Sequence, residues 1–190
     1  MLYLKALSQE LIRFKNLLCE NRNRKFLERA EYMIIKGKQL LIIDRRINRN
    51  SSRFYRDYYK KKRWQTRGYQ NLLSELYLDT EIFFYIASRL IDLFFDGMRG
   101  VVEVSKKERK RFHRIMTIRN ELLEHNQKPG RPIEDEICQF GLNKSYGVYV
   151  RSFKGADAGR PYRDRAYYPL RNSFAKDLVE ILKSSDNKLK

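Results

Sequence analysis

Hydrophobic residues recur at helical spacing along most of the chain. Apolar side chains stand three or four positions apart over residues 3–20, at Leu4, Leu7, Leu11, Phe14 and Leu18. This spacing predicts an amphipathic helix. Residues 24–48 repeat the pattern and contain the apolar block LLII, which predicts a second helix. No proline precedes Pro129, so no proline interrupts helices in this part of the chain.

The clearest helical pattern covers residues 71–95, NLLSELYLDTEIFFYIASRLIDLFF, which are apolar around most of the helix circumference. Such a helix is typical of the centre of a bundle. The sequence DGMRG predicts its C-terminal turn. A further helix is expected over 105–125, with Ser105 and Glu108 forming a capping box. Because the connection is short, we expect an antiparallel hairpin centred near residue 100.

The pattern changes over residues 129–170, where all four prolines and five of the nine glycines lie. These residues disfavour another long helix. YGVYVRSF alternates as strands do, and RAYYPL predicts a partner strand. Residues 171–184 predict a last amphipathic helix. We therefore expect a mainly α fold: one antiparallel helical bundle over residues 1–190, with 129–170 as a basic loop or β-hairpin insertion before the last helix.

The charge of the chain indicates its class of partner. Lysine and arginine number 41 against 23 acidic residues, a formal net charge of +18. Such a surplus predicts an anionic partner, nucleic acid first and a membrane surface second. Cys19 and Cys138 form neither a disulfide framework nor a zinc constellation. The sequence has no apolar run of membrane-spanning length and no signal-peptide pattern, so we expect a cytoplasmic protein without a membrane span.

Residues 45–70 combine basic and aromatic side chains, and NSS within them predicts a helix N-cap. Basic residues bind phosphates and aromatic rings stack on unpaired bases. Alternatively, the rings pack on the bundle while the charges face water, and one helix can do both on two faces. The RNA-binding residues predicted here, with two arginines further along the chain, are Arg53, Arg56, Lys60, Lys61, Lys62, Arg63, Trp64, Arg67, Arg163 and Arg165.

The segment MTIRNELLEHNQ, residues 116–127, places Arg119 within an apolar stripe. The other members of that stripe are Phe112, Ile115, Met116, Leu122 and Leu123. An arginine there needs a carboxylate, a cleft or a partner chain. A structural interpretation pairs Arg119 with Asp79 or Glu81 across the hairpin and lets His125 complement the helix dipole.

The same segment resembles the Arg-Asn-(x)n-His signature of HEPN domains, a family of helical nucleases and nucleic-acid-associated proteins. Here it reads Arg119, Asn120, four residues, then His125. Residues 78–94 also resemble the helix that precedes the motif in some bacterial members. The resemblance implies a metal-independent endoribonuclease without a cofactor. It also implies a homodimer whose two motifs meet at the interface, and a role in toxin–antitoxin or phage-defence systems.

The residue types suit that chemistry. RNA supplies the 2′-OH nucleophile, and His125 can act as general base or acid because histidine titrates near neutral pH. Arg119 can hold two phosphate oxygens, and Asn120 can orient the histidine or the phosphate. The expected products carry a 2′,3′-cyclic phosphate and a 5′-OH. Asp79 and Glu81 would orient Arg119 or His125.

Two other functions remain open. One is a non-catalytic RNA-binding HEPN module in which Arg119 is structural. The other is a basic subunit that is bound by an acidic protein antitoxin. A guide or inhibitory RNA is a further candidate anionic partner.

Overall fold

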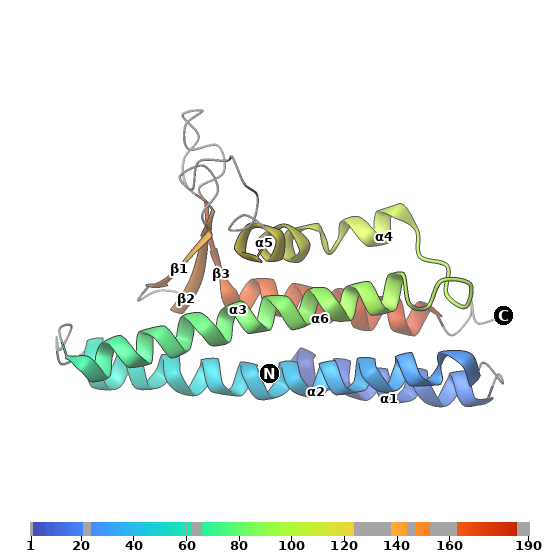
Figure 1. Cartoon of the computed structure of the whole chain (residues 1–190), viewed down its shortest axis with the longest axis horizontal. Helices are drawn as coiled ribbons and strands as arrows, with labels where there is room; N and C mark the ends of the chain where they lie inside the picture. The colour runs from blue at the N-terminus through green and yellow to red at the C-terminus, as the bar shows by residue number, and fades with distance from the viewer. Residues whose placement is uncertain are drawn as a thin grey trace. The chain divides into compact units, whose positions relative to one another are not determined.

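The computed structural model of the chain describes residues 2–20, 24–59, 61, 66–123, 138–143, 147–152 and 163–185. Side chains are described in these ranges except at residues 24, 59 and 120–123 and in the strands apart from Val148. The helices among these residues are α1 (Leu2–Glu20), η1 (Arg24–Phe26), α2 (Leu27–Arg53), η2 (Phe54–Tyr59), α3 (Arg67–Phe95), α4 (Lys106–Lys110), α5 (His113–Leu123) and α6 (Tyr167–Ser184). The strands are β1 (Cys138–Asn143), β2 (Gly147–Ser152) and β3 (Arg163–Ala166). The prediction of a mainly helical bundle is confirmed (Figure 1).

The chain divides into two compact units. Unit 1 contains Met1–Ile42, Tyr85–Met116 and Arg171–Lys190, and unit 2 contains Ile43–Phe84 and Thr117–Leu170. Helices α2, α3, α5 and α6 contribute residues to both units. The expectation of a single domain over residues 1–190 stays a prediction.

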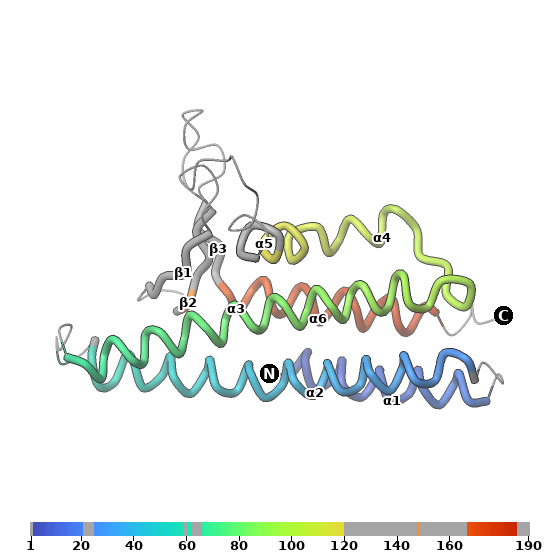
Figure 2. The backbone as a smooth tube through the Cα atoms, in the orientation of Figure 1, coloured from blue at the N-terminus to red at the C-terminus, as the bar shows by residue number. Residues whose placement is uncertain are grey.

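In unit 1, α1 lies alongside the first part of α2, as the backbone trace in Figure 2 shows. Lys15 Nζ lies 2.6 Å from Glu31 Oε1 across this pair of helices. A Cβ atom on Gly37 would lie 2.7 Å from Leu11 Cδ1. Glycine at position 37 therefore allows the two helices to approach closely.

A chain of aromatic contacts fills the core of unit 1. The rings of Phe14 and Phe94 lie 5.9 Å apart, those of Phe95 and Phe112 5.3 Å, and those of Phe112 and Phe174 6.2 Å. These contacts join α1, α3, the turn before α5, and α6. All five side chains are at least nine-tenths buried, so they supply much of the apolar burial that holds the unit together.

The hairpin between α3 and the following helices differs from the expected alignment. A hairpin centred near residue 100 pairs Phe95 with Lys106, but Phe95 contacts Phe112. Two features change the register: backbone turns occupy part of the connection, where Val101 and Val102 donate to the carbonyl of Met98, and the predicted helix over 105–125 is interrupted at Arg111–Phe112. The capping box of Ser105 and Glu108 is confirmed at the start of α4.

In unit 2, the first residue of α6 is part of the core. Tyr167 is fully buried, its ring lies 5.1 Å from that of Phe83, and its hydroxyl donates to Asp44 Oδ1 at 3.0 Å. Helix α6 thus begins four residues before the predicted start at residue 171. Pro169 falls in its first turn, where a missing backbone N–H leaves no helical hydrogen bond unmade.

Unit 2 also contains an antiparallel sheet in the order β1-β2-β3. The predicted hairpin is present as β2 and β3, with Val150 opposite Arg165. Strand β1, with Phe140 opposite Val150, was not predicted. The segment RAYYPL is a strand only through Ala166, because Tyr167 begins α6.

The prediction of a helix start at NSS is wrong, since Asn50, Ser51 and Ser52 lie inside α2.

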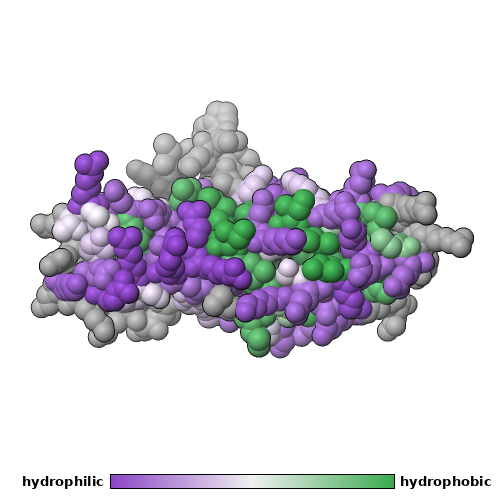
Figure 3. Space-filling model, turned by 90° about the horizontal axis from the view of Figure 1, so that it is seen from below, coloured by the Kyte–Doolittle hydropathy of each residue, from purple (hydrophilic) through white to green (hydrophobic). Residues whose placement is uncertain are grey.

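On the face drawn in Figure 3, hydrophobic residues lie among more numerous hydrophilic ones. Among the described helices, none combines the length and the apolar character that crossing a membrane requires.

Candidate nucleic-acid interface

A row of arginines follows the exposed side of α2 and continues into η2. Arg46, Arg49 and Arg53 are separated by three and four residues, which places them on one side of an α-helix. All three are exposed, and Arg56 in η2 is also exposed. We call these four residues the arginine row. Their guanidinium groups stay charged at any physiological pH, so the row is a permanently positive strip.

Two polar contacts align the row with α3. Arg46 Nη2 lies 2.9 Å from Asp79 Oδ1, and Asn50 Nδ2 donates to Glu75 Oε2 at 3.2 Å. From the first pair to the second, the chain advances four residues along α2, from Arg46 to Asn50, and goes back four along α3, from Asp79 to Glu75. This is the pattern of two antiparallel helices. These side chains therefore set one alignment of the two helices, and Asn50 is 3% exposed although it is polar.

The second and later arginines of the row line a groove. Its volume is about 620 Å³, and its lining residues are Arg49, Asn50, Ser52, Arg53, Arg56 and Glu75. The side-chain amide of Asn50 already donates to Glu75, and the hydroxyl of Ser52 donates to the carbonyl of Asn48 at 2.9 Å. The arginines are therefore the lining groups that are best placed to bind an anion, and they outnumber the one carboxylate of the lining.

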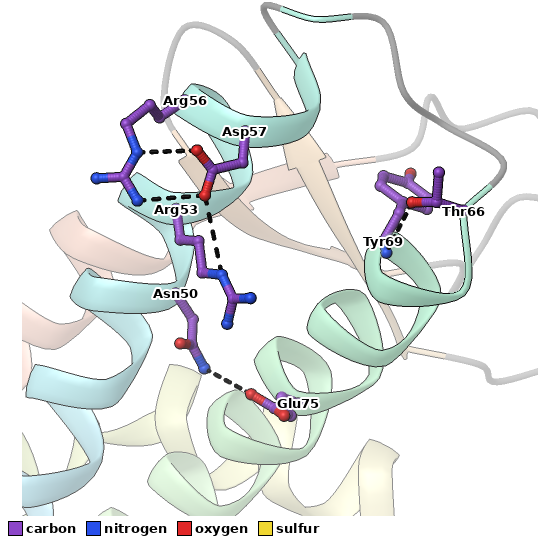
Figure 4. A network of polar contacts seen from close by, with 7 residues as sticks. All are labelled: Asn50, Arg53, Arg56, Asp57, Thr66, Tyr69 and Glu75. Carbon is purple, nitrogen blue, oxygen red and sulfur yellow. Dashed lines mark hydrogen bonds and ion pairs between the residues drawn. The ribbon is translucent and has the colours of Figure 1, made fainter.

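Asp57 lies beside this groove and holds two of its arginines (Figure 4). Arg56 donates to both oxygens of Asp57, at 2.9 and 3.2 Å, and Arg53 Nε lies 3.9 Å from the same carboxylate. The hydrogen bond from Arg56 lowers the pKa of Asp57 and raises that of Arg56. Asp57 is therefore a carboxylate at neutral pH and occupies a place where a phosphate could accept the same bonds.

Asp79 differs from Asp57 in its surroundings. Its side chain is fully buried, and burial raises its pKa although the positive charge of Arg46 opposes that change. Asp79 and Glu81 were predicted to orient Arg119 or His125. The ion pair that the structure places at Asp79 is with Arg46. Glu81 lies in α3 and is half-buried.

The aromatic residues near the row pack on one another. The ring of Phe54 lies 5.6 Å from those of Tyr55 and Tyr69, and the rings of Tyr58 and Tyr69 lie 5.8 Å apart. Phe54 is buried, and the three tyrosines are half-buried. Of the two alternatives for this segment, packing on the bundle is therefore observed for these rings. The cluster joins η2 to the start of α3 and so positions Arg56.

The motif residues lie on or after α5. Ile115 and Ile118 are buried, and Arg119, the residue after Ile118, is half-buried, with its Nε atom shielded from solvent. Asn120 belongs to α5, but its side chain lies outside the described part of the structure. His125 lies outside the described residues altogether. The geometry of the three predicted catalytic side chains therefore stays a prediction.

The other predicted RNA-binding residues have varied positions. Lys61 and Arg67 are exposed. Arg163 and Arg165 belong to β3, opposite Ser152 and Val150, and their side chains are not described. The predicted residues that lie outside the described ranges are Lys60, Lys62, Arg63 and Trp64.

Sequence reasoning missed Arg46, Arg49 and Glu75, and it placed Asp79 beside Arg119 or His125, whereas Asp79 forms an ion pair with Arg46. Their spacing carried a signal: arginines at 46, 49 and 53 share one helix face, and Glu75 and Asp79 share one face of α3. This pattern could be recognised only if α2 was expected to continue through NSS, because Arg53 follows that segment.

Comparison of the chain with protein-family models, curated proteins and solved structures gives no match. Its function is therefore inferred from its own residues.

Proposed function

We propose that this protein is a metal-independent endoribonuclease of the HEPN type, with Arg119, Asn120 and His125 as its catalytic residues. The observation that carries the proposal is the position of Arg119 on α5. It is a half-buried arginine beside Ile115 and Ile118, with a shielded Nε. Packing of this kind holds a planar guanidinium in a defined orientation, as bidentate phosphate binding requires.

The proposed reaction uses the 2′-OH of the RNA. Its oxygen forms a bond to the adjacent phosphorus while the bond from phosphorus to the 5′-oxygen breaks. His125 accepts the 2′-OH proton or donates a proton to the leaving 5′-oxygen, and Arg119 stabilises the charge on the phosphorane oxygens. The products are a 2′,3′-cyclic phosphate and a 5′-OH. The single motif histidine of one chain, His125, cannot do both proton transfers at once, so we propose a homodimer in which two motifs share a cleft.

A second candidate is a non-catalytic RNA-binding module. The arginine row favours it, because exposed arginines beside a groove provide phosphate contacts without any need for a catalytic site. Under this alternative Arg119 has a structural role only.

Cleavage of RNA in the presence of EDTA tests the proposal and separates the two candidates. The variants are Arg119→Ala and His125→Ala, and the matched controls are Arg114→Ala and His113→Ala, which change exposed residues of the same helix. We expect wild type and both controls to leave cyclic phosphate ends, and the two motif variants to lose at least about 100-fold in rate. Equal cleavage by all five proteins would contradict the site assignment. RNA binding without cleavage by wild type would support the binding module.

A further inference from the structure

We propose that the groove lined by Arg49, Arg53 and Arg56 binds the phosphodiester backbone of an RNA strand, and that Asp57 occupies the place of a phosphate in the free protein. The inference rests on the proposed function for the identity of the ligand as RNA. It adds a binding surface that is separate in sequence from the Arg119–Asn120–His125 motif, and a carboxylate that competes with the ligand.

The shape of the positive strip favours a chain of phosphates over a single one. The three arginines of α2 lie three and four residues apart, so the row from Arg46 to Arg53 extends by roughly 10 Å at 1.5 Å per residue. A lone phosphate binds guanidinium groups only around its own oxygens and does not extend along the row. A nucleic-acid strand presents a new phosphate every few ångströms and can therefore use successive arginines of the row.

The contacts within the groove show which cations are best placed for the ligand. Arg46 is held by buried Asp79, and Arg56 by both oxygens of Asp57. Arg53 lies 3.9 Å from Asp57, longer than a hydrogen bond. Among the described residues, Arg49 makes no ion pair or hydrogen bond through its side chain. Arg49 and Arg53 are therefore the first points of contact for a phosphate.

Asp57 limits the affinity of the same surface. A carboxylate and a phosphate both accept two parallel hydrogen bonds from a guanidinium, so they compete for Arg56 and Arg53. Asp57 is 31% exposed, and a phosphate can reach the same guanidinium groups from solvent. Removing its charge while keeping its size should strengthen RNA binding.

The surrounding aromatic rings indicate whether the groove has a base preference. The cluster of Phe54, Tyr55, Tyr58 and Tyr69 is engaged in contacts within the protein. Arginines that contact phosphates carry no base preference. The groove should therefore bind strands of different sequence with similar affinity.

The test is binding of a fluorescently labelled single-stranded RNA of about 12 nucleotides, a typical single-strand site size. Every 2′-OH is methylated, so cleavage by 2′-OH attack cannot occur and binding is measured apart from catalysis. Fluorescence anisotropy over a salt series compares wild type with Arg49→Ala, Arg53→Ala and Asp57→Asn. Arg89→Ala is the matched control, because Arg89 is an arginine of α3 with a side chain 45% exposed and an ion pair to Asp92. Thermal unfolding checks that each variant is folded.

We expect Arg49→Ala and Arg53→Ala each to weaken binding by about tenfold. Each should also reduce the slope of log affinity against log salt by about 0.7, the loss of one phosphate contact on a single strand. Asp57→Asn should bind several times more tightly than wild type, and Arg89→Ala should bind like wild type.

Other results would overturn the inference in distinguishable ways. If wild type binds RNA and the groove variants bind like Arg89→Ala, the groove is not the site, while the proposed function stands. If Asp57→Asn binds more weakly, Asp57 supports the site and does not compete with RNA. If inorganic triphosphate displaces the RNA at equal molar concentration, the groove recognises a small polyphosphate instead of a strand. If wild type binds no RNA, the proposed function itself fails.

Discussion

The carboxylate of Asp79 lies 2.9 Å from Nη2 of Arg46, and the two side chains differ in exposure: Asp79 is fully buried, whereas 45% of Arg46 is exposed. The two partners should therefore respond differently to removal. A buried carboxylate without its cation keeps its desolvation cost, but an exposed arginine without its carboxylate is solvated by water.

Arg46→Ala should lower the free energy of unfolding at pH 7 by about 2 kcal/mol, because it leaves the charge of Asp79 buried without its partner. Chemical denaturation measures the change. Arg45→Ala is the control, since Arg45 is an exposed neighbour on the same helix. An equal loss in both variants would mean that the ion pair contributes nothing specific.

Asp79→Asn should raise the free energy of unfolding at pH 7, by at most about 1 kcal/mol, since it removes a buried charge. Burial raises the pKa of Asp79 in the folded chain. The folded protein thus binds this proton more tightly than the unfolded chain does. The stability contributed by the group is full below the unfolded pKa of about 4 and is lost as pH rises through the folded value. Denaturation from acid to neutral pH should show Asp79→Asn gaining on wild type as pH rises, and a constant difference would contradict this account.

Tyr167→Phe should destabilise the protein by about 2 kcal/mol, because it removes a hydrogen bond to the buried carboxylate of Asp44. The effect arises where α6 meets α2 within unit 2. Tyr168→Phe, a change to a half-buried neighbour, is the control. Similar unfolding midpoints for the two variants would show that the hydroxyl of Tyr167 is dispensable.

Arg111→Ala should cost about 1 kcal/mol at low salt and less at high salt, as expected for an exposed ion pair. Arg111 Nη2 lies 2.6 Å from Asp177 Oδ1 and also bonds to Glu180, so it ties the turn between α4 and α5 to α6 within unit 1. Arg114→Ala provides the comparison in the same denaturation series. A loss that does not depend on salt would point to packing of the arginine stem instead.

Gly68→Ala should have opposite effects in two backgrounds. Alanine favours a helix over glycine by about 1 kcal/mol, but its Cβ would lie 2.6 Å from the hydroxyl of Tyr58. In the wild type the contact should cancel the gain. In Tyr58→Phe, which lacks the hydroxyl, the same substitution should be stabilising. A double-mutant cycle by denaturation measures this coupling, and additive effects would exclude the contact.

Helical periodicity predicted the elements that are determined by residues close together in the sequence. The predicted apolar positions of α1 are buried, and so are most apolar residues of the span 71–95, although Leu78 and Tyr85 are exposed. The Ser105 cap depends only on residues within one turn. The continuation of α2 through NSS was not predictable in this way. Asn50 is a good N-cap residue by itself, but here Glu75 on another helix satisfies it. A tertiary partner thus outweighed a local preference.

The candidate sites divide along similar lines. Basic composition identified the region of Arg53 and Arg56, since charge is visible in any sequence. The carboxylate partners were not assigned: Asp57, which holds Arg53 and Arg56, was counted only as part of a basic segment, and Asp79 pairs with Arg46, 33 positions earlier. The alignment of the α3 hairpin failed for a related reason: the turns at Val101 and Val102 and the break at Arg111–Phe112 were not visible in the helical pattern.

The winding of η2 has a consequence for how this surface can change in evolution. Residues Phe54–Tyr59 form a π-helix, a form that usually arises as a local insertion in an α-helix. One residue more or less turns everything beyond it by about 100° about the helix axis. Deletion of the codon for Phe54 or Tyr55 would keep every arginine of the row and still redirect Arg56. The direction of the charges along the groove can thus change through the length of the backbone, with no substitution at all.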